Sequence, residues 1–175
     1  MLRLVVALIL APLLVGPLAA CDSSGEGTSI TINAVDSDGN MVAGVDKNGQ
    51  MSVNVPGFSG KISLPKMKLD AGDFDLNGVK LYPGSTISTM NIDTRDGGNS
   101  GKDSGNVRIS FDSPATPKAV QDWFLQRLNG DAGFKVKVDG AGLTGTTDDN
   151  KPFKLELAPV GADHARGTII LSDQK

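Results

Sequence analysis

Hydrophobic residues alternate with polar ones in several short stretches between residues 29 and 64. Ile30 and Ile32 have polar neighbours, and a second run alternates at Met51, Val53 and Val55. A period of two is typical of strands that bury one face. The Asp-Gly and Asn-Gly pairs at residues 38–39 and 48–49 favour tight hairpin turns. The pattern predicts short strands with only small aliphatic side chains, a ribbon that is marginally stable by itself.

The same alternation recurs with larger side chains in the second half of the chain. Strands are expected near residues 86–92, 107–111, 134–138, 143–147, 153–157 and 168–171. Between the first two of these, residues 93–105 contain no hydrophobic side chain. A polar stretch of this kind predicts a long exposed loop.

One segment of this half has helical spacing instead. Thr116 can cap a helix, with Pro117 at the first helical position. The following apolar residues recur three and four apart and share one face: Ala119, Val120, Trp123, Phe124 and Leu128. The Asn129-Gly130 pair is a stop signal. We predict an amphipathic helix over about residues 116–129.

The order of these elements predicts an α+β fold. Its core would be a mainly antiparallel β-sheet with one amphipathic α-helix, at about 116–129, packed on it and preceded by a short-stranded β ribbon. An antiparallel sheet buries one face, and a single helix is enough to cover that face. Residues 29–64 would form the short-stranded region, and residues 65–175 the α+β domain.

The N-terminal segment has the layout of a secretory signal. Arg3 is the only charged residue before Asp22, and residues 4–18 are almost entirely aliphatic. An apolar stretch of about 15 residues has the length of a signal-peptide core, whereas a membrane-spanning helix needs about 20. We expect residues 1–20 to be a signal peptide and residues 21–28, which are small and polar, to be a flexible tether.

The run Leu18-Ala19-Ala20-Cys21 resembles a bacterial lipobox, and Cys21 is the only cysteine. The resemblance implies that Cys21 carries acyl chains such as palmitate and anchors the mature chain to a membrane of the bacterial envelope without spanning it. The protein would face the periplasm, and Asp22 leaves inner versus outer membrane undecided. Two alternatives stay open: an ordinary secretory signal with a free thiol at Cys21, and an uncleaved N-terminal anchor.

A second resemblance covers most of the mature chain. Its elements are GVKLYPGS at residues 78–85, SPATP at residues 113–117 and the helix containing Trp123-Phe124. Together they are similar to small uncharacterised bacterial lipoproteins. This resemblance implies an envelope localisation and an architecture, but no activity and no site residues.

Composition removes several classes of function. After the loss of Arg3 with the signal, 16 Lys and Arg residues oppose 20 Asp and Glu residues, a net charge near -4 with the signs interspersed. This balance gives no electrostatic reason to expect nucleic-acid binding. With no cysteine beyond Cys21, the mature chain has no internal disulfide and no cysteine-based zinc or iron–sulfur site. No cofactor is expected.

His164 is the only histidine and hence the only candidate base for a Ser-His-Asp hydrolase. Such an enzyme needs a nucleophile within hydrogen-bond reach of the histidine and an acid that orients it. No serine lies in a Gly-x-Ser-x-Gly context. The surrounding segment is small and polar, which favours an exposed histidine in a hairpin turn over a catalytic one.

Three groups of acidic residues are candidates for metal or acid–base sites. Asp36, Asp38 and Asn40 have the first spacings of an EF-hand loop, but Met41 replaces the required glycine and Lys47 the bidentate glutamate. Aspartates beside glycines are also typical of β-turns. The remaining groups read as solvated connector and turn residues: Asp70, Asp73 and Asp75, and Asp148 and Asp149. No metal site is expected.

Tyr82 and Trp123 are the remaining candidates for ligand contacts. An aromatic such as Tyr82 more often plugs the sheet edge beside its turn, and Trp123 on the apolar helix face favours a place in the core. A pocket between helix and sheet near them would suit a small-ligand carrier. The leading hypothesis is a membrane-tethered, non-catalytic binding or structural module of the envelope, whose partner is an unidentified envelope protein or ligand. The carrier and a weak hydrolase using His164 are the alternatives.

Overall fold

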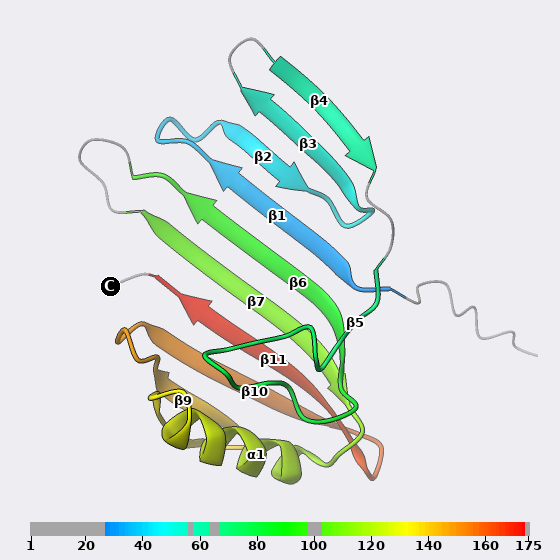
Figure 1. The fold of residues 1–175 in the computed structure, drawn as a ribbon, viewed down its shortest axis with the longest axis vertical. Helices are drawn as coiled ribbons and strands as arrows, with labels where there is room; N and C mark the ends of the chain where they lie inside the picture. Colours follow the sequence, from blue (N-terminus) through cyan, green and yellow to red (C-terminus); the bar gives the residue numbers. More distant parts are fainter. Residues whose placement is uncertain (1–26, 56–57, 64–66, 98–102, 174–175) are drawn as a thin grey trace, which may run out of the picture.

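The computed structural model describes residues 27–55, 58–63, 67–97 and 103–173. Of these residues, 54% lie in strands and 10% in a single helix. The strands form one mixed sheet (Figure 1). The predicted α+β class, an antiparallel sheet with a helix on it and a preceding ribbon, is therefore wrong, and the described chain is mainly β. Within the same residues, no helix has both the length and the apolar character needed to span a membrane.

Within the described ranges, eleven strands and one helix follow one another. The elements before the helix are β1 (Ser29–Val35), β2 (Met41–Val45), β3 (Gln50–Val55), β4 (Phe58–Ser63), β5 (Leu69–Asp70), β6 (Thr86–Arg95) and β7 (Ser104–Ser113). The helix and the strands after it are α1 (Pro117–Gly130), β8 (Lys135–Asp139), β9 (Gly142–Thr146), β10 (Pro152–Val160) and β11 (His164–Ser172). Across the sheet the order is β4-β3-β2-β1-β6-β7-β11-β10-β9-β8, and β5 pairs with β6.

The pairing of β1 with β6 explains why the predicted ribbon does not exist as a separate element. These two strands are parallel, with Ile30 opposite Met90 and Ile32 opposite Ile92, whereas the other strand pairs are antiparallel. The pairing joins the two apolar rows and satisfies backbone groups that an unpaired β6 edge would leave open. Alternation along a strand shows which side chains share a face, but it does not name the strand's partner.

The predicted exposed loop at residues 93–105 is also shorter than expected. β6 continues through Asp93 to Arg95, and β7 already begins at Ser104. The register pairs Asp93 with Asn106 and Arg95 with Ser104, so the ladder extends into residues with no hydrophobic side chain. Backbone hydrogen bonds to a neighbouring strand hold this polar segment in the sheet, and no apolar pattern is needed for that.

The single helix lies where helical spacing placed it. Thr116 is the N-cap and its side chain accepts a hydrogen bond from the Ala119 N–H, with Pro117 in the first turn. The buried side chains are Val120, Gln121, Phe124 and Leu128. Ala119 and Trp123, which we expected in the buried face, are only partly buried. The inward face is thus rotated slightly toward Gln121, and Trp123 lies at its margin.

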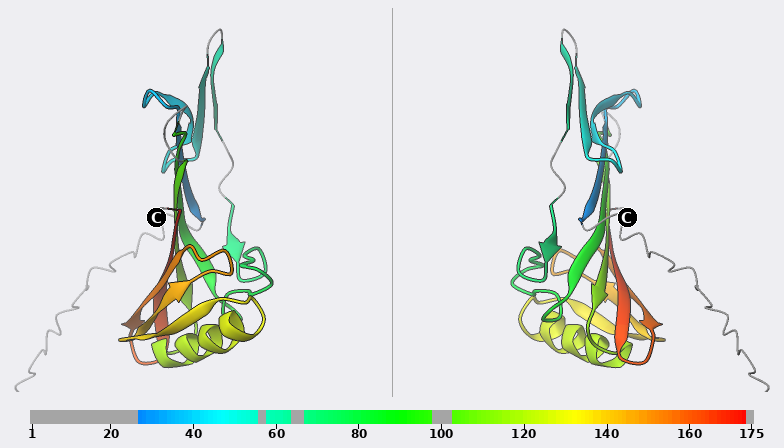
Figure 2. Two further views of the ribbon diagram at one scale, coloured as in Figure 1. Left: turned by 90° about the vertical axis from the view of Figure 1, so that its left-hand side faces the viewer. Right: turned by 90° about the vertical axis from the view of Figure 1, so that its right-hand side faces the viewer.

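The hydrophobic core occupies only the half of the molecule that contains α1. The helix contacts β8 to β11, which curve around it (Figure 1). The segment between β5 and β6 packs into the same core through Phe74, Val79 and Leu81. Figure 2 shows α1 and this segment on one side of the sheet, while the half formed by β1 to β4 extends away as a single layer. Both faces of that layer therefore belong to the surface of the molecule.

Candidate binding surface

The register of β1, β6 and β7 sorts their side chains into two chemically different faces. Asn33 lies opposite Asp93, and Asp93 lies opposite Asn106. The adjacent positions on the three strands form a second row of Ile32, Ile92 and Val107, and this row points to the other side of the sheet. One face of this part of the sheet is therefore polar and the other is apolar.

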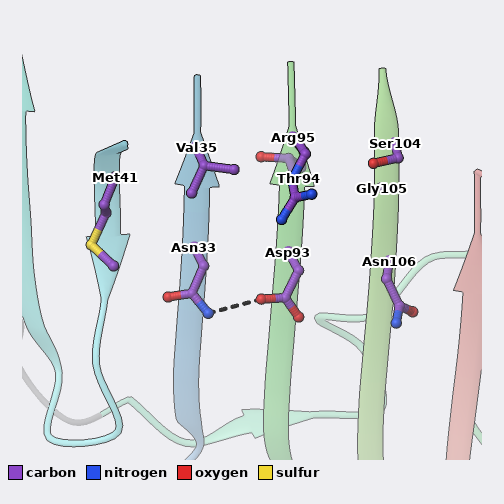
Figure 3. Close-up of a pocket in the computed structure, with 9 residues that line it drawn as sticks. All are labelled: Asn33, Val35, Met41, Asp93, Thr94, Arg95, Ser104, Gly105 and Asn106. Atoms are coloured by element: carbon purple, nitrogen blue, oxygen red, sulfur yellow. Dashed lines mark hydrogen bonds between the residues drawn. The ribbon is translucent and has the colours of Figure 1, made fainter. Parts of the chain in front are cut away.

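The polar face is hollowed at the ends of these three strands. The hollow has a volume of about 640 Å³ and is lined by Asn33, Val35, Met41, Asp93, Thr94, Arg95, Ser104, Gly105 and Asn106. Figure 3 shows the row Asn33, Asp93 and Asn106 side by side, with Val35, Arg95 and Ser104 beyond it toward the strand ends. A second hollow of about 390 Å³ continues across β2 and β3 and shares Asn33 and Met41 with the first.

The polar groups of the hollow are only partly satisfied within the chain. Asn33 Nδ2 donates a hydrogen bond to Asp93 Oδ1 at 2.8 Å. Among the described residues, the side chains of Arg95, Ser104 and Asn106 have no hydrogen-bond or ion-pair partner. The hollow therefore offers a guanidinium, a hydroxyl and an amide that are free to bind something else.

The sequence pattern does not reveal this surface, because the polar stretch that contains Asp93, Arg95 and Ser104 predicts a loop. One signal was present. Asn91, Asp93 and Arg95 continue the period of two set by Met90 and Ile92, so the strand could have been extended on alternation alone. The partners of these residues in β1 and β7 lie far away in sequence, and no local pattern identifies them.

The structure brings Tyr82 and Trp123 together, but as a structural contact. Their ring centroids are 5.4 Å apart in an edge-to-face arrangement, and Trp123 Nε1 donates to the Lys80 carbonyl at 3.2 Å. The Arg127 guanidinium covers the Trp123 ring, 3.8 Å from its centroid. This group fastens the segment before β6 to α1. Neither aromatic residue lines the polar hollow or its continuation across β2 and β3.

His164 begins β11 beside the β10–β11 turn rather than in the turn itself. Its Nδ1 lies 2.6 Å from Asp163 Oδ1, and both side chains are exposed. Hydrogen bonding to His164 lowers the pKa of Asp163. Within the described part of the chain, no serine hydroxyl forms a hydrogen bond with His164. The structure thus places an acid beside the histidine, and no described hydroxyl is hydrogen-bonded to its ring.

Asp36 caps the turn between β1 and β2 with its own carboxylate. Oδ1 accepts the N–H groups of Asp38 and Asn40 at 3.0 and 2.9 Å, which lowers the pKa of Asp36. Asp46 repeats this geometry ten residues later, accepting the N–H groups of Asn48 and Gln50. The EF-hand-like spacing therefore belongs to a repeated hairpin turn.

The other acidic candidates also make local contacts. Asp70 Oδ1 accepts the Gly72 N–H and Asp73 Oδ2 accepts the Asp70 N–H. The Gly78 N–H, and next to it Lys80 at 3.2 Å, lower the pKa of Asp75. Among the described residues, no three His, Cys, Asp or Glu side chains are grouped so that they could hold a metal ion. Asp148 and Asp149 lie in the β9–β10 turn and line a separate cleft.

Cys21, the predicted lipidation site, lies outside the described residues, as does the whole predicted signal peptide. No known protein family, curated protein or solved structure matches this chain. Its function therefore has to be inferred from the sequence and from the surfaces described above.

Proposed function

We propose that this chain is a lipid-anchored protein of the bacterial envelope that acts as a non-catalytic binding module. In this proposal acyl chains on Cys21 hold it at a membrane, and the polar hollow of β1, β6 and β7 contacts another envelope protein. The observation that carries the proposal is the set of polar groups in that hollow, on Arg95, Ser104 and Asn106, that find no partner among the described residues.

The place where the chain enters the sheet supports this arrangement. Thr28 is buried, its N–H donates to the Met67 carbonyl at 2.7 Å and its Oγ1 donates to the Ile87 carbonyl at 2.6 Å. From Thr28 back to Cys21 the chain can span at most about 28 Å. The hollow lies at the other end of β1, roughly 20 Å further along the strand. A lipid anchor at Cys21 would therefore leave the hollow accessible.

The side chains of the hollow suit a protein partner. Met and Arg are enriched in protein–protein interfaces, and here Met41, which is 50% exposed, lies in the same hollow as Arg95. Asp93 and Arg95 carry opposite charges, so the surface has no strong net charge. A partner that supplies hydrogen-bond donors and acceptors fits it better than a highly charged polymer.

Site-specific photo-crosslinking in cells tests the binding surface. A photoreactive amino acid at Asn106 should give a discrete adduct with one envelope protein. The same residue at Gln126, on the exposed side of α1, should not. An additional Arg95→Glu substitution should weaken the Asn106 adduct, whereas Lys135→Glu on β8 should leave it intact. Equal adducts from positions 106 and 126, or an adduct insensitive to Arg95→Glu, would rule the hollow out.

The anchor needs a separate test. Intact-mass analysis of the protein from its native host should show a chain that begins at an acylated Cys21, and Cys21→Ala should release the protein from the membrane fraction. An unmodified thiol, or a different first residue, would remove the anchor and leave the binding surface to be judged by crosslinking alone.

A further inference from the structure

A separate cleft, beside the β9–β10 turn, lies on the opposite face of the sheet from the hollow in Figure 3, and Gly105 of β7 lines both. This cleft has a volume of about 320 Å³. Its lining comes from Leu76 and Asn77 before β6, from Phe134 before β8, from the start of β7 and the end of β11, and from the turn between β9 and β10. It therefore opens at the boundary between the helix-containing core and the single-layer half of the sheet.

The floor of the cleft is apolar and firmly supported. Phe134 is only 4% exposed, and its ring packs edge-to-face against Phe153 with centroids 5.6 Å apart. Leu76, Val107 and Leu171 pack against the edge of the core and are partly exposed. A volume of about 320 Å³ would admit about ten waters at roughly 30 Å³ each. Replacing them with an apolar group would remove more of this floor from water, which is favourable.

The rim of the cleft carries an excess of negative charge. Lys151 Nζ pairs with Asp173 Oδ1 at 3.2 Å, so these two opposite charges offset each other. Asp148 and Asp149 line the same cleft, and neither carboxylate has an ion-pair partner among the described residues. Two carboxylates that no described side chain neutralises therefore line a cleft with an apolar floor.

The turn that carries these carboxylates has a defined conformation. The Thr147 N–H donates to the Lys151 carbonyl at 2.9 Å, and the Lys151 N–H donates to Thr147 Oγ1 at 3.1 Å. Asn150 has φ of 59°, a left-handed conformation that asparagine tolerates better than most residues. A ligand would thus meet a turn whose backbone is already ordered, which lowers the entropic cost of binding.

We propose that this cleft binds a small amphipathic amine. The apolar part of the ligand would lie on Phe134, Val107 and Leu171, and its ammonium group would lie between the carboxylates of Asp148 and Asp149. A fatty acid or other apolar anion has the wrong charge for this rim. The site is independent of the lipid anchor and of the polar hollow, since it shares only the backbone of Gly105 with the latter.

NMR titration of the full mature chain tests the site, using the Cys21→Ala form so that no detergent competes. The probe is 2-phenylethylamine, and 3-phenylpropionate is its matched anion. The amine should shift the amide signals of residues 147–151 and 171–173 in a saturable way, with a dissociation constant of about 1 mM, as expected for so small a ligand. The anion should leave these signals unchanged.

Substitutions on the rim supply the second arm. The Asp148→Asn, Asp149→Asn double variant keeps the side-chain shapes and should weaken amine binding at least about tenfold, because it removes both charges. Asp122→Asn on α1, combined with Asp131→Asn at its C-cap, changes the net charge equally and should have no effect. Equal binding of amine and anion, unchanged binding by the rim variant, or shifts confined to the Figure 3 face would overturn the proposal. Shifts that grow with protein concentration before any probe is added would identify a second copy as the occupant, and would overturn it as well.

Discussion

The ring of Phe111 lies directly over Gly167, its register partner on β11. A Cβ atom built on Gly167 would be 2.1 Å from Phe111 Cζ, far inside van der Waals contact. Phe111 is completely buried and also packs against Phe124 of α1. The absence of a side chain at residue 167 is therefore what lets an aromatic ring lie flat on the sheet beneath the helix.

Gly167→Ala should destabilise the fold by about 1–3 kcal/mol, the usual cost of overpacking a core. Gly130→Ala is the matched control, because a Cβ there meets nothing within 4 Å and the residue lies in α1. Urea unfolding followed by circular dichroism measures both. If Gly167→Ala unfolds at the same urea concentration as the parent, Phe111 does not occupy this position.

Gln121 is the polar member of the buried helix face and should be essential to it. Its Nε2 donates to the carbonyls of Gly140 and Gly142 at 3.1 and 2.9 Å, which ties α1 to the β8–β9 turn. Gln121→Met keeps the side-chain volume but leaves both carbonyls without this donor, so we expect a loss of about 1–3 kcal/mol. Gln126→Met on the exposed side of α1 should change the free energy of unfolding little. Similar stabilities for the two variants would show that water replaces the lost hydrogen bonds.

The contact between Tyr82 and Trp123 should be measurable as an energetic coupling. In a double-mutant cycle with Tyr82→Leu and Trp123→Leu, we expect a coupling of about 0.5–1.5 kcal/mol, typical of edge-to-face aromatic pairs. Circular dichroism is the appropriate readout because Trp123 is the only tryptophan. Strictly additive effects would mean that the two rings do not stabilise each other, and would reopen the question of a ligand at these residues.

The turns capped by Asp36 and Asp46 should lose stability in acid. Backbone N–H groups, chiefly those of Asn40 and Gln50, lower the two pKa values below the ordinary value of 3.8. Because folding lowers their pKa values, the two carboxylates stabilise the fold fully above pH 3.8. This stabilisation disappears as the pH falls through the folded-state pKa values. Replacing both residues with alanine should lower the Tm at neutral pH and flatten its dependence on pH below 3.8.

Asp38→Ala is the control for these turns, because Asp38 is exposed and its carboxylate caps no backbone N–H in the described residues. Thermal melts at a series of pH values compare the three proteins. If the double variant keeps the acid sensitivity of the parent, other carboxylates account for it.

Local features of this protein could be predicted from the chain itself. The period-two stretches around Ile30, Met51 and Ile109 are strands, the turns at Gly39 and Gly49 have the positive φ that hairpins require, and the Thr116 cap begins the helix. These features depend on residues that lie close together in sequence, and backbone geometry restricts them to a few conformations. The helix was placed to within a residue or two for the same reason.

The partners of the strands and the binding surfaces were decided by tertiary structure. Nothing local indicates that β1 pairs in parallel with β6, yet this pairing puts Asn33 beside Asp93 and creates the polar hollow. The cleft beside the β9–β10 turn likewise combines Leu76, Phe134 and Asp148 from three separate segments. Alternation is set by the chain's own geometry, whereas pairing is set by which distant strand can share an apolar face and complete the backbone hydrogen bonds. That choice is made only when the whole sheet assembles.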